Sequence, residues 1–177
     1  MKSIEAFLIA LRMMESGGDY QIVNSLNFLG AYQFGEAALT DLGFVRYDGD
    51  AFDNNYSGGW TGKHGVRSTN DFLNSPSAQD KAAREWVELM WHYIELQNLD
   101  SYAWTRVGDV TVTPSGMLAA THLLGPDSLA RYLHSNGQAN LRDPYGTPIE
   151  SYIIKMSEFS VPFAPSAPNV AEFAAGR

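Results

Sequence analysis

The chain has 177 residues, of which 45% are apolar and 18% charged. This composition suits a folded domain with a buried core and excludes a disordered chain. Twenty acidic and twelve basic side chains give a net charge of −8. We therefore expect neither nucleic acid nor anionic lipid as a partner, because both need a basic surface. The chain has no cysteine, which excludes disulfides and thiolate chemistry.

The N-terminal segment predicts an amphipathic helix over residues 2–15, with Ser3 as the N-cap. Its apolar residues at helical spacing are Ile4, Phe7, Leu8, Leu11 and Met14. Glu5 and Arg12 interrupt the apolar run and no small-x-small cleavage motif follows, so we expect a mature helix and not a signal peptide. No stretch approaches the roughly 18 apolar residues of a membrane span, so no membrane insertion is expected.

The remaining start and stop signals are also mostly helical. A short helix is predicted over 35–42, closed by Gly43, and a long helix over 77–97 with a capping-box-like start at Ser77 and Asp80. Three further helices are predicted to begin at prolines, at Thr113-Pro114, Gly125-Pro126 and Thr147-Pro148. The only strand that the pattern suggests is 107–113.

Two segments lack helical periodicity. Residues 46–65 are dense in Gly, Asp, Asn and aromatic residues, which indicates a long functional loop. Residues 161–177 are rich in Pro and Ala and predict a tail or linker. The sequence thus predicts one mainly α domain over 1–160 with one long irregular loop, followed by the tail.

The segment Glu15-Ser16-Gly17-Gly18 places a carboxylate at the end of an apolar helix, before two glycines that turn the backbone away. Partial burial disfavours the charged form of a carboxyl, so we expect Glu15 to hold its proton and to suit general acid catalysis. An exposed helix-terminal glutamate is the alternative interpretation.

A second segment, Gly30-Ala31-Tyr32-Gln33-Phe34-Gly35, brackets an amide and two aromatics with glycines. Gln33 is a candidate hydrogen-bond partner for a sugar, and Tyr32 or Phe34 a candidate platform for a pyranose ring. A buried hydrophobic turn is the alternative.

Together these segments resemble the lytic transglycosylase and goose-type lysozyme group, in which Glu-Ser at a helix end is followed by a Gly-x-x-Gln turn. The resemblance spans residues 4–135, and it implies a lysozyme-like helical fold with Glu15 as acid/base and Ser16 and Gln33 at the substrate. The family's later Ala-Tyr-Asn step is replaced here by Ala120-Thr121-His122, as in some phage-associated and effector-type peptidoglycan hydrolases. His122 takes the position of the family's asparagine.

The resemblance implies cleavage of the β-1,4 bond between N-acetylmuramic acid and N-acetylglucosamine, with no cofactor. A lone glutamate suits a transglycosylase that forms 1,6-anhydro ends. A hydrolase needs a second carboxylate, for which the candidates are Asp48, Asp50 and Asp53.

The 46–65 loop offers Tyr56 and Trp60, with Tyr47 and Phe52, as candidate glycan contacts. A loop anchored by its aromatics is an equal alternative. Asp48, Asp50 and Asp53 do not match an EF-hand, and the histidines lack metal-binding spacing, so the sequence predicts no metal site.

Three other functions stay open: a hydrolytic muramidase, a chitinase, and a non-catalytic glycan-binding or virion structural module. The expected partner is a peptidoglycan glycan strand, with an immunity or inhibitor protein as a further partner. Because no export signal is recognised, we expect action on the cell wall after delivery by a phage, by a secretion apparatus or as part of a larger protein.

Overall fold

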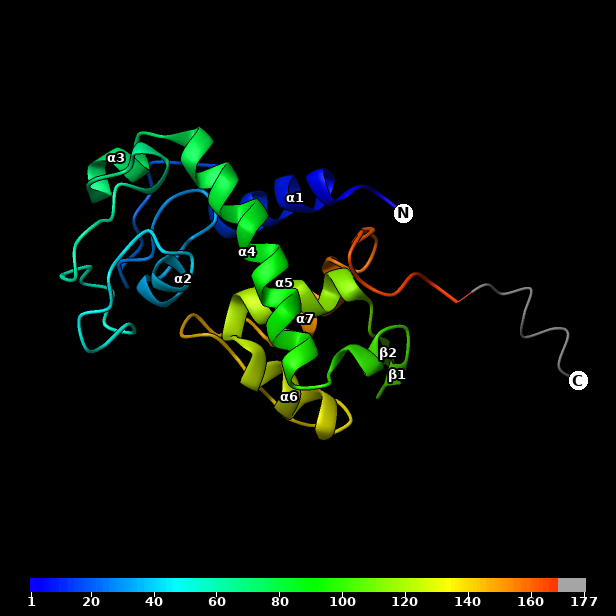
Figure 1. Cartoon of the computed structure of the whole chain (residues 1–177). Coiled ribbons are helices and arrows are strands. Elements are labelled where there is room, and N and C mark those ends of the chain that lie inside the picture. The colour runs from blue at the N-terminus through cyan, green and yellow to red at the C-terminus, as the bar shows by residue number, and fades with distance from the viewer. Residues whose placement is uncertain (169–177) are drawn as a thin grey trace, which may run out of the picture. The chain divides into compact units, whose positions relative to one another are not determined.

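The computed structural model describes residues 1–168, and it confirms the prediction of a mainly α chain (Figure 1). The chain divides into two compact units, Leu8–Val87 and a second made of Met1–Phe7 with the segment from Glu88 onward. We call them the 8–87 unit and the 88–177 unit. The sequence predicts a single domain over 1–160, whereas the chain divides near the middle of its longest helix, so each unit is described by itself.

The 8–87 unit is built from short helices joined by long turns (Figure 1). Its elements are most of α1 (Ile4–Ser16), α2 (Glu36–Asp41), the 3-10 turn η1 (Lys63–Gly65), α3 (Thr69–Leu73) and the first half of α4 (Pro76–Leu96). Ser3 caps α1 as predicted, because its Oγ accepts the Ala6 N–H at 3.3 Å. The long helix begins at Pro76, one residue earlier than predicted, and Ser75 in place of Ser77 accepts the Ala78 N–H at 3.3 Å.

Aromatic side chains fill the core of the 8–87 unit. Phe72 of α3 contacts the rings of Phe34, Phe44 and Trp60, with centroid distances of 6.2, 5.7 and 5.5 Å. Phe34, Phe44 and Phe72 are fully buried. The sequence reading missed α3, because five residues are too few for a periodic pattern, but Ser68 caps it by accepting the Asp71 N–H. Short elements of this kind depend on the packing of their aromatic residues.

The predicted loop is closed at its base into a compact segment. Arg46 N–H donates to the Gly59 carbonyl at 3.0 Å and Thr61 N–H donates to the Phe44 carbonyl at 2.9 Å. Gly58 passes so close to the Arg46 carbonyl that a Cβ there would lie 1.7 Å from the oxygen. Residues 46–59 therefore form a loop with fixed ends, in which Asp, Asn and Tyr side chains set the internal turns.

The 88–177 unit is organised around α5 (Pro114–Leu124), whose residues are buried from Pro114 to Thr121. α5 packs against α7 (Ile149–Lys155) and α6 (Pro126–His134). Thr113 caps α5 through the Gly116 N–H, as predicted, whereas α7 begins one residue later than predicted, with Pro148 at its N-cap. The unit also holds the 3-10 turn η2 (Asp100–Tyr102) and a two-stranded hairpin of β1 (Arg106–Val107) and β2 (Val110–Thr111), in place of the predicted single strand.

The beginning of the predicted tail belongs to the 88–177 unit. Val161 is buried, and the Trp104 indole N–H donates to the Pro165 carbonyl at 2.8 Å. The remainder of the predicted tail, 169–177, lies outside the described residues. Among the described helices, none combines the length and the apolar character that crossing a membrane requires.

Gly116 tests the contact between α5 and α7. A Cβ at this position would lie 2.6 Å from the Ile153 carbonyl oxygen, which is backbone and cannot swing away. Intrinsic helix preference alone favours Gly116→Ala by about 1 kcal/mol. Because overpacking outweighs that preference, we expect the substitution to lower the free energy of urea unfolding by about 1–3 kcal/mol.

Ser77→Ala, at an exposed position of α4, is the control for Gly116→Ala and should change the free energy of unfolding by less than about 0.5 kcal/mol. A Gly116→Ala protein more stable than the wild type would contradict this packing.

Candidate functional site

The candidate catalytic carboxyl ends the first helix. Glu15 is the penultimate residue of α1 and is half-buried. Gly17 and Gly18 adopt φ values of +68° and +84° and close the helix, with the Gly18 N–H donating to the Arg12 carbonyl at 3.1 Å. Both φ values lie in the left-handed region, which glycine adopts at little steric cost. The glycines therefore end α1 directly after the Glu15-Ser16 pair.

Ser16 joins the end of α1 to the second predicted segment. Its hydroxyl donates to the Ala31 carbonyl at 2.8 Å, lies 3.1 Å from the Arg12 carbonyl oxygen, and accepts the Gly18 N–H at 3.1 Å. Ser16 was predicted to contact substrate. That contact stays a prediction, and within the protein the hydrogen bonds of Ser16 fix the place of Glu15.

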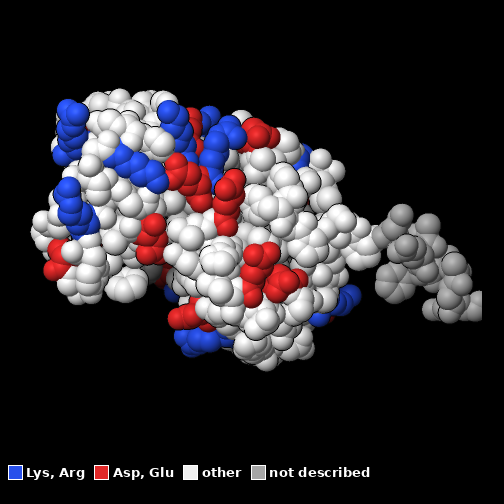
Figure 2. Space-filling view, viewed as in Figure 1, with Lys and Arg blue, Asp and Glu red and all other residues white. Residues whose placement is uncertain are grey.

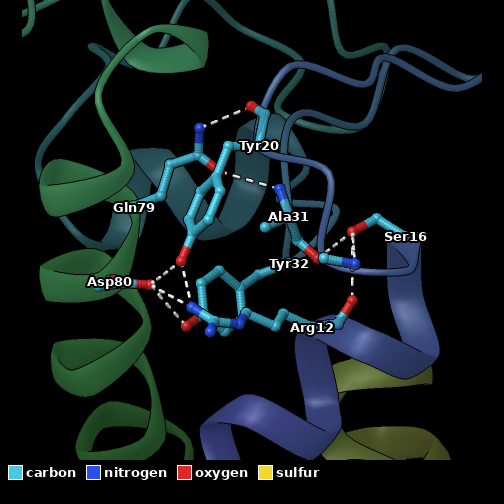
Figure 3. Close-up of polar contacts among 8 residues, drawn as sticks. Arg12, Ser16, Tyr20, Ala31, Tyr32, Gln79 and Asp80 are labelled. Carbon is cyan, nitrogen blue, oxygen red and sulfur yellow. Dashed lines mark hydrogen bonds and ion pairs between the residues drawn. The ribbon is translucent and has the colours of Figure 1, made fainter.

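The other side of Ala31 is held by a buried amide from α4. Gln79 is fully buried, and its Oε1 accepts the Ala31 N–H at 2.9 Å. Its Nε2 donates to the carbonyls of Tyr20 and Phe72, at 2.8 and 2.9 Å. We call the bonds of Ser16 and Gln79 to the two backbone polar groups of Ala31 the Ala31 clamp (Figure 3). The clamp fixes three segments, the ends of α1 and α4 and the turn after Leu29, against one another.

Gln33 lies at the tip of a tight turn. Leu29 and Phe34 exchange two backbone hydrogen bonds of 2.9 Å, and the Gln33 N–H donates to the Gly30 carbonyl at 3.0 Å. Gln33 itself has a φ of +51° and is half-buried, with its Nε2 bound to the Gly30 carbonyl at 2.9 Å. The Gln33 side chain, two residues after Ala31, is therefore held in one orientation before any ligand binds.

Arg12, Tyr20, Tyr32 and Asp80 form a polar network beside the clamp (Figure 3). The hydroxyls of Tyr20 and Tyr32 both donate to Asp80 Oδ1 at 2.8 Å. Arg12 Nη1 lies 3.5 Å from the same oxygen and also donates to the Tyr20 hydroxyl. Burial, and then the hydrogen bond to Asp80, raise the pKa of both tyrosines. The network holds the phenols neutral and connects α1 to α4 beside Ala31.

The structure corrects the role of three predicted aromatic contacts. Tyr32, Phe34 and Tyr56 are at most 9% exposed, so their ring faces pack in the core. The Tyr56 hydroxyl donates to the carbonyls of Asn27 and Phe34, at 2.6 and 3.2 Å. Trp60 is half-buried and stacks on Tyr56, with ring centroids 6.0 Å apart. The alternative interpretation, a buried turn and a loop anchored by its aromatics, accounts for these residues.

The exposed aromatic rings of the loop are Tyr47 and Phe52, which are 66% and 86% exposed. In this loop they are the rings whose faces are open to a sugar. The sequence could not separate these two rings from Tyr56, because all three occur in the same Asp- and Asn-rich setting.

Two carboxylates of the loop gather around Glu36, which is fully buried at the start of α2. One oxygen from each of Glu36, Asp48 and Asp53 lies within 4.8 Å of the others. Asp50, the third candidate for a second carboxylate, is exposed and accepts the Phe52 N–H at 3.0 Å.

His122 is half-buried on α5 and belongs to the 88–177 unit, so the geometry of the 8–87 unit does not include it. Its predicted contact with substrate stays a prediction. The 88–177 unit also contains an open hollow of about 370 Å³ between the segment after α6 and the start of α7, bordered by Gln138, Arg142 and Glu150. None of the predicted site residues lines it.

Gln79 and Asp80 were missed as partners of the site. Their signal in the sequence was faint: an adjacent amide and carboxylate on the first turns of a helix whose apolar stripe starts only at Ala83. The spacing of Asp80 from Ser77 predicts a capping-box role for it instead. The feature that could have revealed Gln79 and Asp80 is their position on α4, where the inward-facing apolar residues of the helix should begin.

Comparison with known proteins gives no relative. No protein-family model, curated protein or solved structure matches this chain. The mainly α class is therefore what is established of the fold, and the likeness to lysozyme-like enzymes enters below as a proposal.

Gly30 tests the clamp. A Cβ on Gly30 would lie 2.1 Å from Gln79 Oε1, whereas a Cβ on Gly43 would meet nothing within 4 Å, and the two glycines have φ values of +70° and +73°. Alanine at either position carries the backbone strain of about 1–2 kcal/mol. Gly30→Ala must also displace Gln79 from the Ala31 N–H, so we expect it to lose about 1–3 kcal/mol more in urea unfolding. Equal losses in the two variants would show that Gln79 does not hold the turn.

Tyr32 gives a test by pH. Its pKa is raised above the ordinary 10.0, so its contribution to stability is full below about pH 10 and is lost as the pH rises toward the folded-state pKa. We expect the unfolding free energy of Tyr32→Phe to fall less steeply than that of the wild type between about pH 9 and 11. Tyr47→Phe, which removes an exposed hydroxyl, is the control, and a Tyr32→Phe slope equal to that of the wild type would contradict the network.

Proposed function

We propose that this chain is a lysozyme-like enzyme that cleaves the β-1,4 bond between N-acetylmuramic acid and N-acetylglucosamine, with Glu15 as the general acid and base. The observation that carries the proposal is the hydrogen bond from Ser16 Oγ to the Ala31 carbonyl at 2.8 Å. It joins the Glu-Ser helix end to the Gly-x-x-Gln turn, the two segments in which the chain resembles lytic transglycosylases and goose-type lysozymes.

Both segments hold a polar side chain in a fixed position, the acid Glu15 in one and the amide Gln33 in the other. Glu15 is held by the helix end that Gly17 and Gly18 close, and Gln33 by the turn that the Ala31 clamp fixes. Preorganised groups of this kind lower the barrier without having to rearrange during the reaction. Gln33 is proposed to bind a hydroxyl or acetamido group of the glycan.

In the proposed reaction, protonated Glu15 donates its proton to the glycosidic oxygen as the bond from C1 of the muramic acid to that oxygen breaks. The N-acetylglucosamine leaves with a free 4-hydroxyl. The Glu15 carboxylate then accepts the proton of the muramyl 6-hydroxyl while O6 bonds to C1. The product is a 1,6-anhydro ring, and Glu15 regains its proton.

The placement of the loop carboxylates favours this route over hydrolysis. Asp48 and Asp53 lie with Glu36, and their oxygens accept bonds from Ser57 and Asn55. A hydrolase would need one of them free to activate a water opposite Glu15. We therefore propose a transglycosylase, with a hydrolytic muramidase as the alternative that product analysis separates.

The substrate sets the place of action, since peptidoglycan lies outside the cytoplasmic membrane. We propose that the chain reaches the wall by phage or secretion-apparatus delivery, and that an immunity or inhibitor protein is a further partner. At a net charge of −8 the chain gains no electrostatic steering toward an anionic wall, which favours delivery close to the substrate.

The test is digestion of purified peptidoglycan, with mass spectrometry of the released fragments. The wild type should release fragments with 1,6-anhydro-muramic ends. Glu15→Gln should lower the rate by at least about a hundredfold, because general acid–base catalysis of this kind contributes roughly 10²–10⁴. Gln33→Ala should weaken substrate binding.

Asp19→Asn is the matched control, since Asp19 is an exposed acid four residues after Glu15 that only accepts the Gln21 N–H. Full activity in Glu15→Gln would remove Glu15 from the reaction, and reducing ends in the wild-type products would make the enzyme a hydrolase. Binding of glycan without release of fragments would instead assign a non-catalytic module.

A further inference from the structure

Three carboxylates converge where the 46–59 loop meets the start of α2. Glu36 is the first residue of α2, and Asp48 and Asp53 come from the loop. One oxygen of each lies within 4.8 Å of the other two. Within residues 1–168, none of the three forms an ion pair with a lysine or arginine. The convergence leaves negative charge that no lysine or arginine of the described residues neutralises.

Glu36 is the member that distinguishes this cluster from a surface group of acids. The residue is 0% exposed, and its Oε1 is buried with no hydrogen-bond partner. Its Oε2 accepts the Tyr56 N–H at 2.8 Å, and its own N–H donates to Asn54 Oδ1 at 2.8 Å. Such a buried carboxylate oxygen without a donor is costly and implies a missing partner.

The spacing of the cluster matches a calcium ion. Calcium binds oxygen ligands at about 2.3–2.6 Å, so two oxygens on one ion lie at most about 5 Å apart. The 4.8 Å limit found here falls inside that span. Carboxylate oxygens are the ligands that hard divalent cations prefer, and an irregular loop suits the flexible coordination of calcium better than the strict octahedron of magnesium.

We propose that Glu36, Asp48 and Asp53 bind a calcium ion that ties the 46–59 loop to the start of α2. The ion supplies the partner of Glu36 Oε1 and neutralises the two loop aspartates. This sequence spacing is not that of an EF-hand, so the site arises from the fold of the loop and not from a linear motif. The proposal stands whether or not the chain cleaves glycans, because none of the three residues takes part in the proposed reaction.

The test uses the full chain, stripped of metal with a chelator and titrated with CaCl2 by isothermal calorimetry. We expect one calcium ion per chain and a melting temperature that rises by roughly 5–10 °C at a hundredfold excess over the dissociation constant. Magnesium chloride should give a smaller rise. Asp48→Asn and Asp53→Asn should each weaken the affinity by at least about tenfold, because each removes a charged ligand.

Asp50→Asn is the matched control, since Asp50 lies in the same loop and is exposed, outside the cluster. It should bind calcium like the wild type. Circular dichroism of the metal-free Asp48→Asn and Asp53→Asn proteins verifies that they are folded, and these two variants keep the test valid if Glu36→Gln does not fold.

Two results would overturn the proposal. One is the absence of both heat and thermal shift in the wild type at about 10 mM CaCl2, which exceeds the weakest range of protein calcium sites. The other is an equal loss of affinity in Asp50→Asn and in Asp48→Asn, which would show a diffuse attraction to the acidic loop and no defined site.

Discussion

The backbone of Ala31 is the point on which the arrangement of the 8–87 unit depends. Its carbonyl accepts a hydrogen bond from the Ser16 hydroxyl, and its N–H donates to Gln79 Oε1. The backbone of this single residue therefore connects the end of α1 to α4. Both bonds are made by side chains that are wholly or partly shielded from water, where a lost partner costs more than a formed bond contributes. The site therefore depends on satisfied backbone groups as well as on the aromatic packing of the core. The helices α2 and α3 of this unit have only six and five residues, so the unit needs such polar connections to hold its turns in place.

Hydrogen bonds from buried polar side chains to the backbone also fix the acidic loop, residues 46–59. Asn54 occupies a left-handed backbone conformation and bonds both the Glu36 N–H and the Leu26 carbonyl, while Glu36 bonds the Tyr56 N–H. The loop is thus fixed by polar side chains directed inward, and the cluster around Glu36 is the place where this pattern leaves an oxygen without a donor. The Ala31 clamp is complete within the protein, whereas the Glu36 cluster needs a cation. The two sites differ in that respect, and this is why one supports the proposed chemistry and the other the proposed calcium ion.

Much of the helical framework could be predicted from the sequence, because apolar periodicity, N-caps and proline starts are local signals. The C-terminal ends of α1 and α4 and the Thr113 cap all lie within one residue of where those signals place them. The buried polar residues could not be predicted. Glu36 and Gln79 look like surface residues in the sequence, since only contacts with Tyr56 and Ala31, distant along the chain, make their burial favourable. For the same reason Tyr32 and Tyr56 were predicted to face a ligand: a ring that packs in the core and a ring that stacks on a sugar have the same sequence signature.

The most direct test of the central claim is amide chemical-shift mapping of ¹⁵N-labelled Glu15→Gln protein with a soluble N-acetylglucosaminyl–N-acetylmuramic acid fragment. We expect this variant to bind without cleaving, so that the bound state persists during the measurement. We expect the largest shifts on Gly17 and Gly18 and on the turn from Gly30 to Gln33, which the Ala31 clamp connects. Shifts confined to the hollow beside Gln138 and Arg142, with the clamped turn unchanged, would contradict it.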